Sequence, residues 1–122
     1  MRLALFFTAA LLSASVHAAG TTDAYRVRTA DELARVCGAT PSDPEAATAL
    51  AFCHGVLAGA YGYYVAVTPV ERRFVCVPNP GPNRAQIANG FVEWLKKRPN
   101  LASDGAIDAL FRYAEETFPC KP

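Results

Sequence analysis

The chain has 122 residues, of which 52% are hydrophobic and 19% are charged. This length is enough for one domain and too short for two, and the apolar content excludes a chain that is disordered throughout. The 12 basic and 11 acidic side chains nearly balance, so charge does not indicate a protein that binds nucleic acid or an acidic membrane surface.

The N-terminus has the pattern of a secretory signal peptide. Arg2 precedes the apolar stretch 3–12, and the small residues that follow predict cleavage after Ala18. A membrane anchor is the alternative, but the ten residues of this stretch are half of the ~20 that span a bilayer. We therefore expect a cleaved signal peptide over 1–18, a tail over 19–28 and a single domain over 29–122.

Two helices are predicted in the first half of the domain. Residues 29–32 (Thr-Ala-Asp-Glu) have the sequence of a capping box, so a short helix begins there and ends at Gly38. Asp43 and Pro44 are typical of an N-cap followed by the first helical residue. They predict a second helix over residues 44–67.

The second helix has apolar or small residues on nearly every side, which is typical of a central helix surrounded by others. Glycine is unfavourable inside a helix, but small residues four positions apart, such as Gly55 and Gly59, let another backbone come close. We therefore expect these two glycines to pack closely against another helix of the bundle.

Two more helices are predicted after a proline-rich connection over residues 68–82. Asn83 and Gln86 have capping-box spacing, and Pro99 ends the third helix. The fourth helix is expected to begin near Ser103. The predicted core faces are Ile87, Phe91, Trp94 and Leu95 in the third helix, and Ile107, Leu110, Phe111, Ala114 and Phe118 in the fourth. The sequence thus predicts an all-α, single-domain four-helix bundle.

The exported part of the chain contains four cysteines, Cys37, Cys53, Cys76 and Cys120. An even number of cysteines in an oxidising compartment predicts two disulfides that crosslink the helix bundle. A zinc site would need closely spaced pairs such as C-x-x-C, which the spacings of 16, 23 and 44 residues do not provide. We expect no metal and no cofactor.

The order of the elements favours the pairing Cys37–Cys53 and Cys76–Cys120. Cys37 ends the first helix, and Cys53 lies on the core face of the second, which a short loop makes its neighbour. Cys76 lies in the long connection and Cys120 follows the last helix. The other two pairings remain open, but they require the first helix to reach the connection or the tail.

Catalytic motifs are not found. His54, the single histidine of the exported chain, directly follows Cys53, so the two side chains point about 100° apart and cannot form a nucleophile–base pair. Ser42 and Ser103 stand at helix entries, where capping is the usual role. Phosphate-binding and dinucleotide-binding glycine loops are also missing. The sequence therefore indicates an exported binding protein and not an enzyme.

An ordered set of motifs covers residues 29–120, nearly the whole exported chain. The motifs are Leu33-x-x-x-Cys37, Cys53-His-Gly55-x-x-x-Gly59, Cys76-Val-Pro78, Gln86 followed by Phe91-x-x-Trp94-Leu95-x-x-x-Pro99, and Ala109-Leu110 followed by Phe118-Pro-Cys120. This set resembles the Rap/Tai family, small periplasmic immunity proteins of Gram-negative bacteria.

The resemblance implies a periplasmic protein that neutralises type VI secretion peptidoglycan amidase effectors by binding and occluding them. It also implies a homodimer. We expect neither a nucleic-acid partner nor membrane insertion after signal cleavage. Long loops of compact domains are often functional, so the connection is expected to provide the partner contacts, with Arg72, Arg73, Asn79 and Asn83 as candidates.

A periplasmic stress chaperone or envelope assembly factor with the same helical fold is the alternative function. An acid-triggered chaperone needs a group that titrates in mild acid, and His54 is the histidine available for this purpose.

Overall fold

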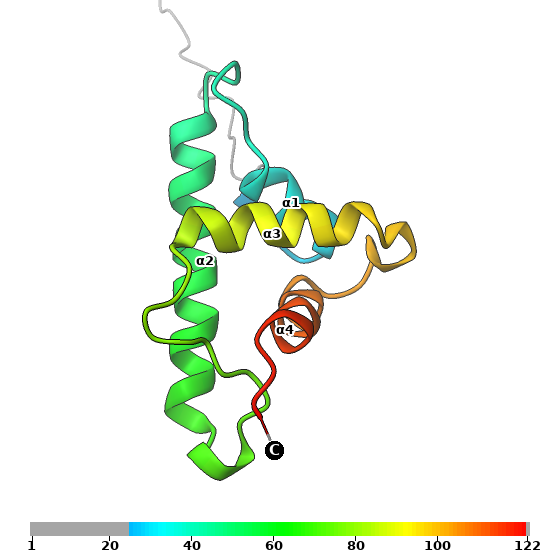
Figure 1. The fold of residues 1–122 in the computed structure, drawn as a ribbon. Coiled ribbons are helices and arrows are strands. Elements are labelled where there is room, and N and C mark those ends of the chain that lie inside the picture. The colour runs from blue at the N-terminus through cyan, green and yellow to red at the C-terminus, as the bar shows by residue number, and fades with distance from the viewer. Residues whose placement is uncertain (1–24, 122) are drawn as a thin grey trace, which may run out of the picture.

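The computed structural model describes residues 25–121 and confirms an all-α fold with two disulfides (Figure 1). The predicted signal peptide lies outside the described residues. The described part has four α helices, two short 3-10 helices and two isolated β-bridges. The elements are α1 (Ala30–Cys37), α2 (Ala46–Val67), η2 (Val70–Arg72), α3 (Arg84–Lys96), η3 (Pro99–Leu101) and α4 (Ala106–Thr117).

The helices cross one another instead of lying side by side. Figure 1 shows α2 along the length of the molecule, with α3 crossing it and α1 behind α3. The short helix α1 contacts α2, α3 and α4, and four of its eight residues are buried. In α2, only four of 22 residues are buried. The prediction that the second helix is central is therefore wrong, because α1 occupies that position and α2 forms one side of the molecule.

Capping boxes begin two of the helices, as the sequence predicts. In α1, Thr29 Oγ1 accepts a hydrogen bond from the Glu32 amide at 3.3 Å, and Glu32 Oε2 accepts one from the Thr29 amide at 3.1 Å. The Arg28 amide also donates to this carboxylate, at 2.6 Å, and these backbone hydrogen bonds lower the pKa of Glu32. Asn83 and Gln86 cap α3 in the same way, with both distances 2.9 Å.

The other two helices begin later than predicted. Helix α2 starts at Ala46 because Asp43 forms a turn: its carboxylate accepts the Glu45 amide at 3.0 Å, and its carbonyl accepts the Ala46 amide at 3.0 Å. Helix α4 starts at Ala106 because the chain before it is bonded to α1. The amides of Ala30 and Asp31 donate to the carbonyls of residues 104 and 102, at 2.8 and 3.0 Å.

The two disulfides join Cys37 to Cys53 and Cys76 to Cys120, which is the pairing that the element order favours. The first links the end of α1 to the middle of α2, and both of its cysteines are buried. The second links the connection before α3 to the chain after α4. An isolated β-bridge between Val75 and Pro119 lies beside it, so the two segments run together.

The core lies between α1, α3, α4 and one side of α2, and Leu33 and Phe91 are fully buried in it. Of the predicted core faces, Phe91, Trp94, Leu95 and Leu110 are buried. Ile107 is instead 45% exposed. The buried face of α4 is formed by Ala106, Ala109, Leu110 and Tyr113, so it is shifted by about one residue from the predicted face.

The ends of α3 and α4 are held together by a polar contact beside the aromatic core. Trp94 Nε1 donates to Glu116 Oε2 at 2.7 Å, and Arg98 donates to the same oxygen at 2.7 Å. The Arg98 guanidinium also lies 4.6 Å from the Trp94 ring centroid. Glu116 therefore satisfies the indole N–H, which would otherwise lose its hydrogen bond on burial.

Close packing at a glycine occurs in α3, at Gly90. A Cβ atom added there would overlap the hydroxyl oxygen of Tyr113. The Tyr113 side chain is buried, and its ring packs against Phe91, Trp94 and Phe118 with centroid distances of 6.0 to 6.5 Å. Burial also raises the pKa of the Tyr113 hydroxyl. The ring has little room to move away, so α3 and α4 can approach this closely only with glycine at position 90.

We expect Gly90→Ala to lower the free energy of unfolding by about 1–3 kcal/mol, as is typical of overpacking. Tyr113→Phe removes the overlapping oxygen, so the cost of Gly90→Ala should be smaller in that background. Asn89→Ala, at an exposed position of the same helix, is the control, and it should stabilise by up to about 0.7 kcal/mol through helix propensity. Urea unfolding of the four variants measures these differences. An equal cost of Gly90→Ala in both backgrounds would contradict the assignment.

Candidate binding surface

The outer face of α2 is made of small and uncharged residues. Helix α2 contains no Asp, Glu, Lys or Arg over its 22 residues. A Cβ at Gly55, Gly59 or Gly62 would have no neighbour within 4 Å. The prediction that Gly55 and Gly59 pack against another helix of the bundle is therefore wrong, because they lie on the side of α2 opposite its buried residues. We call this side the small-residue face; its members are Thr48, Ala51, Gly55, Gly59, Gly62 and Ala66.

Helix α2 is long and apolar enough to cross a membrane, judged by length and composition alone; its mean hydropathy is 1.4. Cys53, however, links it to α1, and it also packs against α3. One side of the helix is thus covered by protein, and the uncharged outer side is what distinguishes it from an ordinary surface helix.

Large exposed apolar side chains gather at the C-terminal end of α2. Tyr63 and Val67 from α2, Phe74 from the connection and Ile107 from α4 line one surface hollow of about 510 Å³. Their exposed fractions are 72%, 54%, 43% and 45%, respectively. We call these four residues the apolar patch. Contiguous exposed apolar surface of this kind is typical of an interaction site.

The segment that carries Phe74 is held firmly against α2. The Tyr64 hydroxyl accepts hydrogen bonds from the amides of Phe74 and Val75, at 2.8 and 3.1 Å. The Tyr64 ring contacts both Phe74 and Phe111, with centroids 5.1 Å apart in each case. Phe74, one of the four patch residues, is therefore held in place by packed aromatic side chains.

The structure separates the four candidate contact residues into two groups. Arg73 closes the C-terminal end of α2, because its guanidinium donates to the carbonyls of Val65 and Thr68 at 3.0 and 3.1 Å. Asn83 caps α3. Arg72 and Asn79 are exposed and remain candidates for partner contacts. The patch residues Tyr63 and Val67 are not identified from the sequence, although the lack of charge along α2 is a signal for them, and Ile107 is predicted there to lie in the core.

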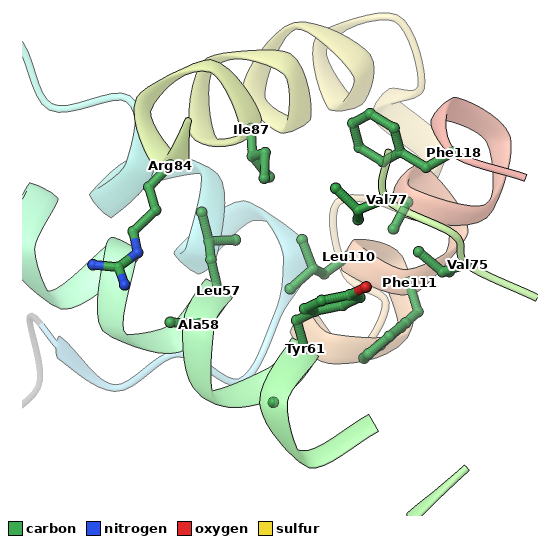
Figure 2. Close-up of a pocket in the computed structure, with 12 residues that line it drawn as sticks. Leu57, Ala58, Tyr61, Val75, Val77, Arg84, Ile87, Leu110, Phe111 and Phe118 are labelled. Carbon is green, nitrogen blue, oxygen red and sulfur yellow. The ribbon is translucent and has the colours of Figure 1, made fainter. Parts of the chain in front are cut away.

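A second hollow lies on the other flank of α2, between α2, α3 and α4. Figure 2 shows Leu57, Ile87, Leu110 and Phe118 converging on it from these helices and the C-terminal segment. Its volume is about 300 Å³, and Arg84 is the one charged residue in its lining. It shares no residue with the apolar patch.

Among residues 25–121, no three His, Cys, Asp or Glu side chains are grouped so that they could hold a metal ion. The described surface instead offers an uncharged helix face and two apolar hollows.

The chain was compared with models of protein families, with curated proteins and with solved structures. The model of a family described as Rap1a immunity proteins matches residues 29–120. Searches of curated proteins and of solved structures found no significant match.

Proposed function

Because the chain belongs to the Rap1a immunity protein family, we propose that it binds and blocks a peptidoglycan amidase effector of type VI secretion in the periplasm. The family match over residues 29–120 is the observation that carries this proposal. Immunity proteins of this family are inhibitors and not enzymes, so the protein needs a binding surface and no catalytic group. The two disulfides are typical of a protein exported to an oxidising compartment.

The apolar patch is the surface we propose for the effector. Tyr63 and Phe74 are aromatic, and aromatic residues are enriched among the side chains that dominate binding energy. Arg72, in η2 of the same connection that carries Phe74, is exposed and forms no ion pair among residues 25–121. It would add a cation at the rim, where charges mainly steer association.

The test of this function is inhibition of an identified amidase. The exported chain, tagged at its C-terminus, is used to capture partners from the periplasm of the native cell. A captured amidase is then purified and assayed on isolated peptidoglycan. One equivalent of the chain should abolish hydrolysis. Full hydrolysis at tenfold excess of the chain would contradict the proposal. A chain that instead prevents the aggregation of many unrelated proteins, and does so only in acid, would behave as a chaperone and would also contradict it.

We further propose that the small-residue face joins two copies of the chain into a homodimer. Small side chains at intervals of three and four residues let two helices approach closely, and the lack of charge removes the cost of desolvating ions. A second copy presents the same uncharged face, so the contact would be self-complementary about a two-fold axis. Since α1 and α3 cover the opposite side of α2, we favour this contact over membrane insertion.

Gly59→Glu is expected to convert the dimer to a monomer, because it places a charge in the centre of the proposed contact. The monomer should remain folded, since a Cβ at this position meets no other atom within 4 Å. Light scattering coupled to size-exclusion chromatography measures the mass of each species. Ala85→Glu, at an exposed position of α3, is the control and should remain dimeric. A monomeric parent protein at high concentration would contradict the dimer.

A further inference from the structure

The hollow between α2, α3 and α4 has the properties of a small-molecule site. Its volume of about 300 Å³ lies at the lower limit of the range for ligand pockets, about 300–1,000 Å³. Its walls are almost entirely apolar: Leu57, Ile87, Leu110 and Phe118 point toward one another across it (Figure 2). Such walls accept a hydrocarbon but give few hydrogen bonds.

One cation stands beside this apolar space. Arg84 is the first residue of α3 and lines the hollow. Figure 2 shows its side chain extending along α2 toward Ala58, at one edge of the space. Arg84 is exposed and has no ion-pair partner among residues 25–121. A guanidinium in this position complements a carboxylate, which it can bind through two parallel hydrogen bonds.

We propose that this hollow binds a medium-chain fatty acid, with the acyl chain between α2, α3 and α4 and the carboxylate on Arg84. An inserted peptide fits less well, because its backbone N–H and C=O groups need hydrogen-bond partners. The walls offer few beside Arg84 and the Tyr61 hydroxyl. An acyl chain has no polar group except at its end, which matches an apolar space with a single cation at its edge.

This site is separate from the proposed effector surface. The apolar patch shares none of its four residues with the hollow, and Phe111 is the residue that lines both this hollow and the one at the patch. Loss of fatty-acid binding and loss of effector binding can therefore be observed independently, and failure of one proposal leaves the other standing.

The first experiment is calorimetric titration of the exported protein with hexanoate, octanoate and decanoate at neutral pH. Each buried methylene group should raise the association constant about fourfold, so each pair should raise it about fifteenfold. The increase should stop once the hollow is filled. Saturable binding with this dependence on length is the expected result. Absence of saturable decanoate binding, or binding that is independent of length, would overturn the proposal.

Variants then locate the ligand. Ala114 is half-buried in the wall, so Ala114→Phe should fill the space and weaken decanoate binding at least tenfold. Ala58→Leu fills it from the opposite side, and it replaces Ala114→Phe if that variant does not fold by circular dichroism. Unchanged binding in a folded space-filling variant would exclude the hollow as the site.

The carboxylate contact is tested by charge. Arg84→Gln should weaken decanoate binding about tenfold while leaving 1-decanol binding nearly unchanged, since the alcohol has no charge to lose. Arg72→Gln, the same change at an exposed arginine outside the hollow, is the control and should affect neither ligand. Equal weakening of both ligands by Arg84→Gln would overturn the assigned role of Arg84.

Discussion

Replacing Cys76 and Cys120 together with alanine is expected to lower the free energy of unfolding by about 4 kcal/mol, from the entropy of an unfolded chain without the crosslink. The large value follows from the 44-residue separation of the two cysteines. The other disulfide closes 16 residues, so removing Cys37 and Cys53 should cost about 3 kcal/mol through the same term, before any cost of lost core packing.

Urea unfolding of the two double variants and of the parent protein measures these costs. Because reduction opens both crosslinks, it should destabilise the parent protein more than either pair of substitutions does. A double variant at positions 76 and 120 that unfolds at the parent's urea midpoint would contradict the prediction. It would mean that the β-bridge between Val75 and Pro119 is sufficient to hold the two segments together.

Tyr63→Arg is expected to weaken the binding of the captured amidase about 100-fold. The side chain is 72% exposed and lies at the apolar patch, so its replacement should leave the fold intact. Aromatic residues that anchor an interface typically contribute 2 kcal/mol or more, and about 2.7 kcal/mol corresponds to 100-fold in the dissociation constant. Surface plasmon resonance with immobilised amidase measures the change.

Two controls distinguish this prediction from a general effect. Asn100→Arg adds the same charge at an exposed position of η3 and should leave the affinity unchanged. Val67→Asp, a second change within the apolar patch, should weaken binding as Tyr63→Arg does. If Tyr63→Arg binds with the affinity of the parent protein, the apolar patch is not the effector surface, whereas the family assignment is unaffected.

The features that the sequence predicts correctly depend on residues close together in the chain or on the order of the helices. The capping boxes at Thr29 and Asn83 each involve residues three positions apart, so their signal is complete within a few residues. The cysteine pairing needs only the order of the helices. By contrast, the start of α4 is set by hydrogen bonds from Ala30 and Asp31, which are more than 70 positions away and leave no local signal.

Which sides of α2 are buried also cannot be predicted from the sequence of the helix itself. An apolar helix is ordinarily apolar because other helices surround it, and the sequence of residues 46–67 does not show which of its sides are covered. The prediction of the partner-contact residues has the same difficulty, because the sequence does not show which side chains are already occupied. Arg73 and Asn83 stand in or beside the irregular connection as contact residues would, but their side chains are occupied in capping α2 and α3. Tyr63 and Val67 are exposed, although they belong to the helix that the sequence predicts to be central.

The positions of the two disulfides also decide how this protein withstands proteases. A single cut between Cys37 and Cys53, or between Cys76 and Cys120, leaves the resulting fragments covalently joined. Within residues 37–120, only a cut between Cys53 and Cys76 separates the chain into two pieces. That interval contains the basic pair Arg72 and Arg73, a target for trypsin-like enzymes. The Arg73 side chain is bound to the end of α2 whereas Arg72 is exposed, so the peptide bond after Arg72 is the one we expect a trypsin-like enzyme to cut, and its cleavage would divide the molecule.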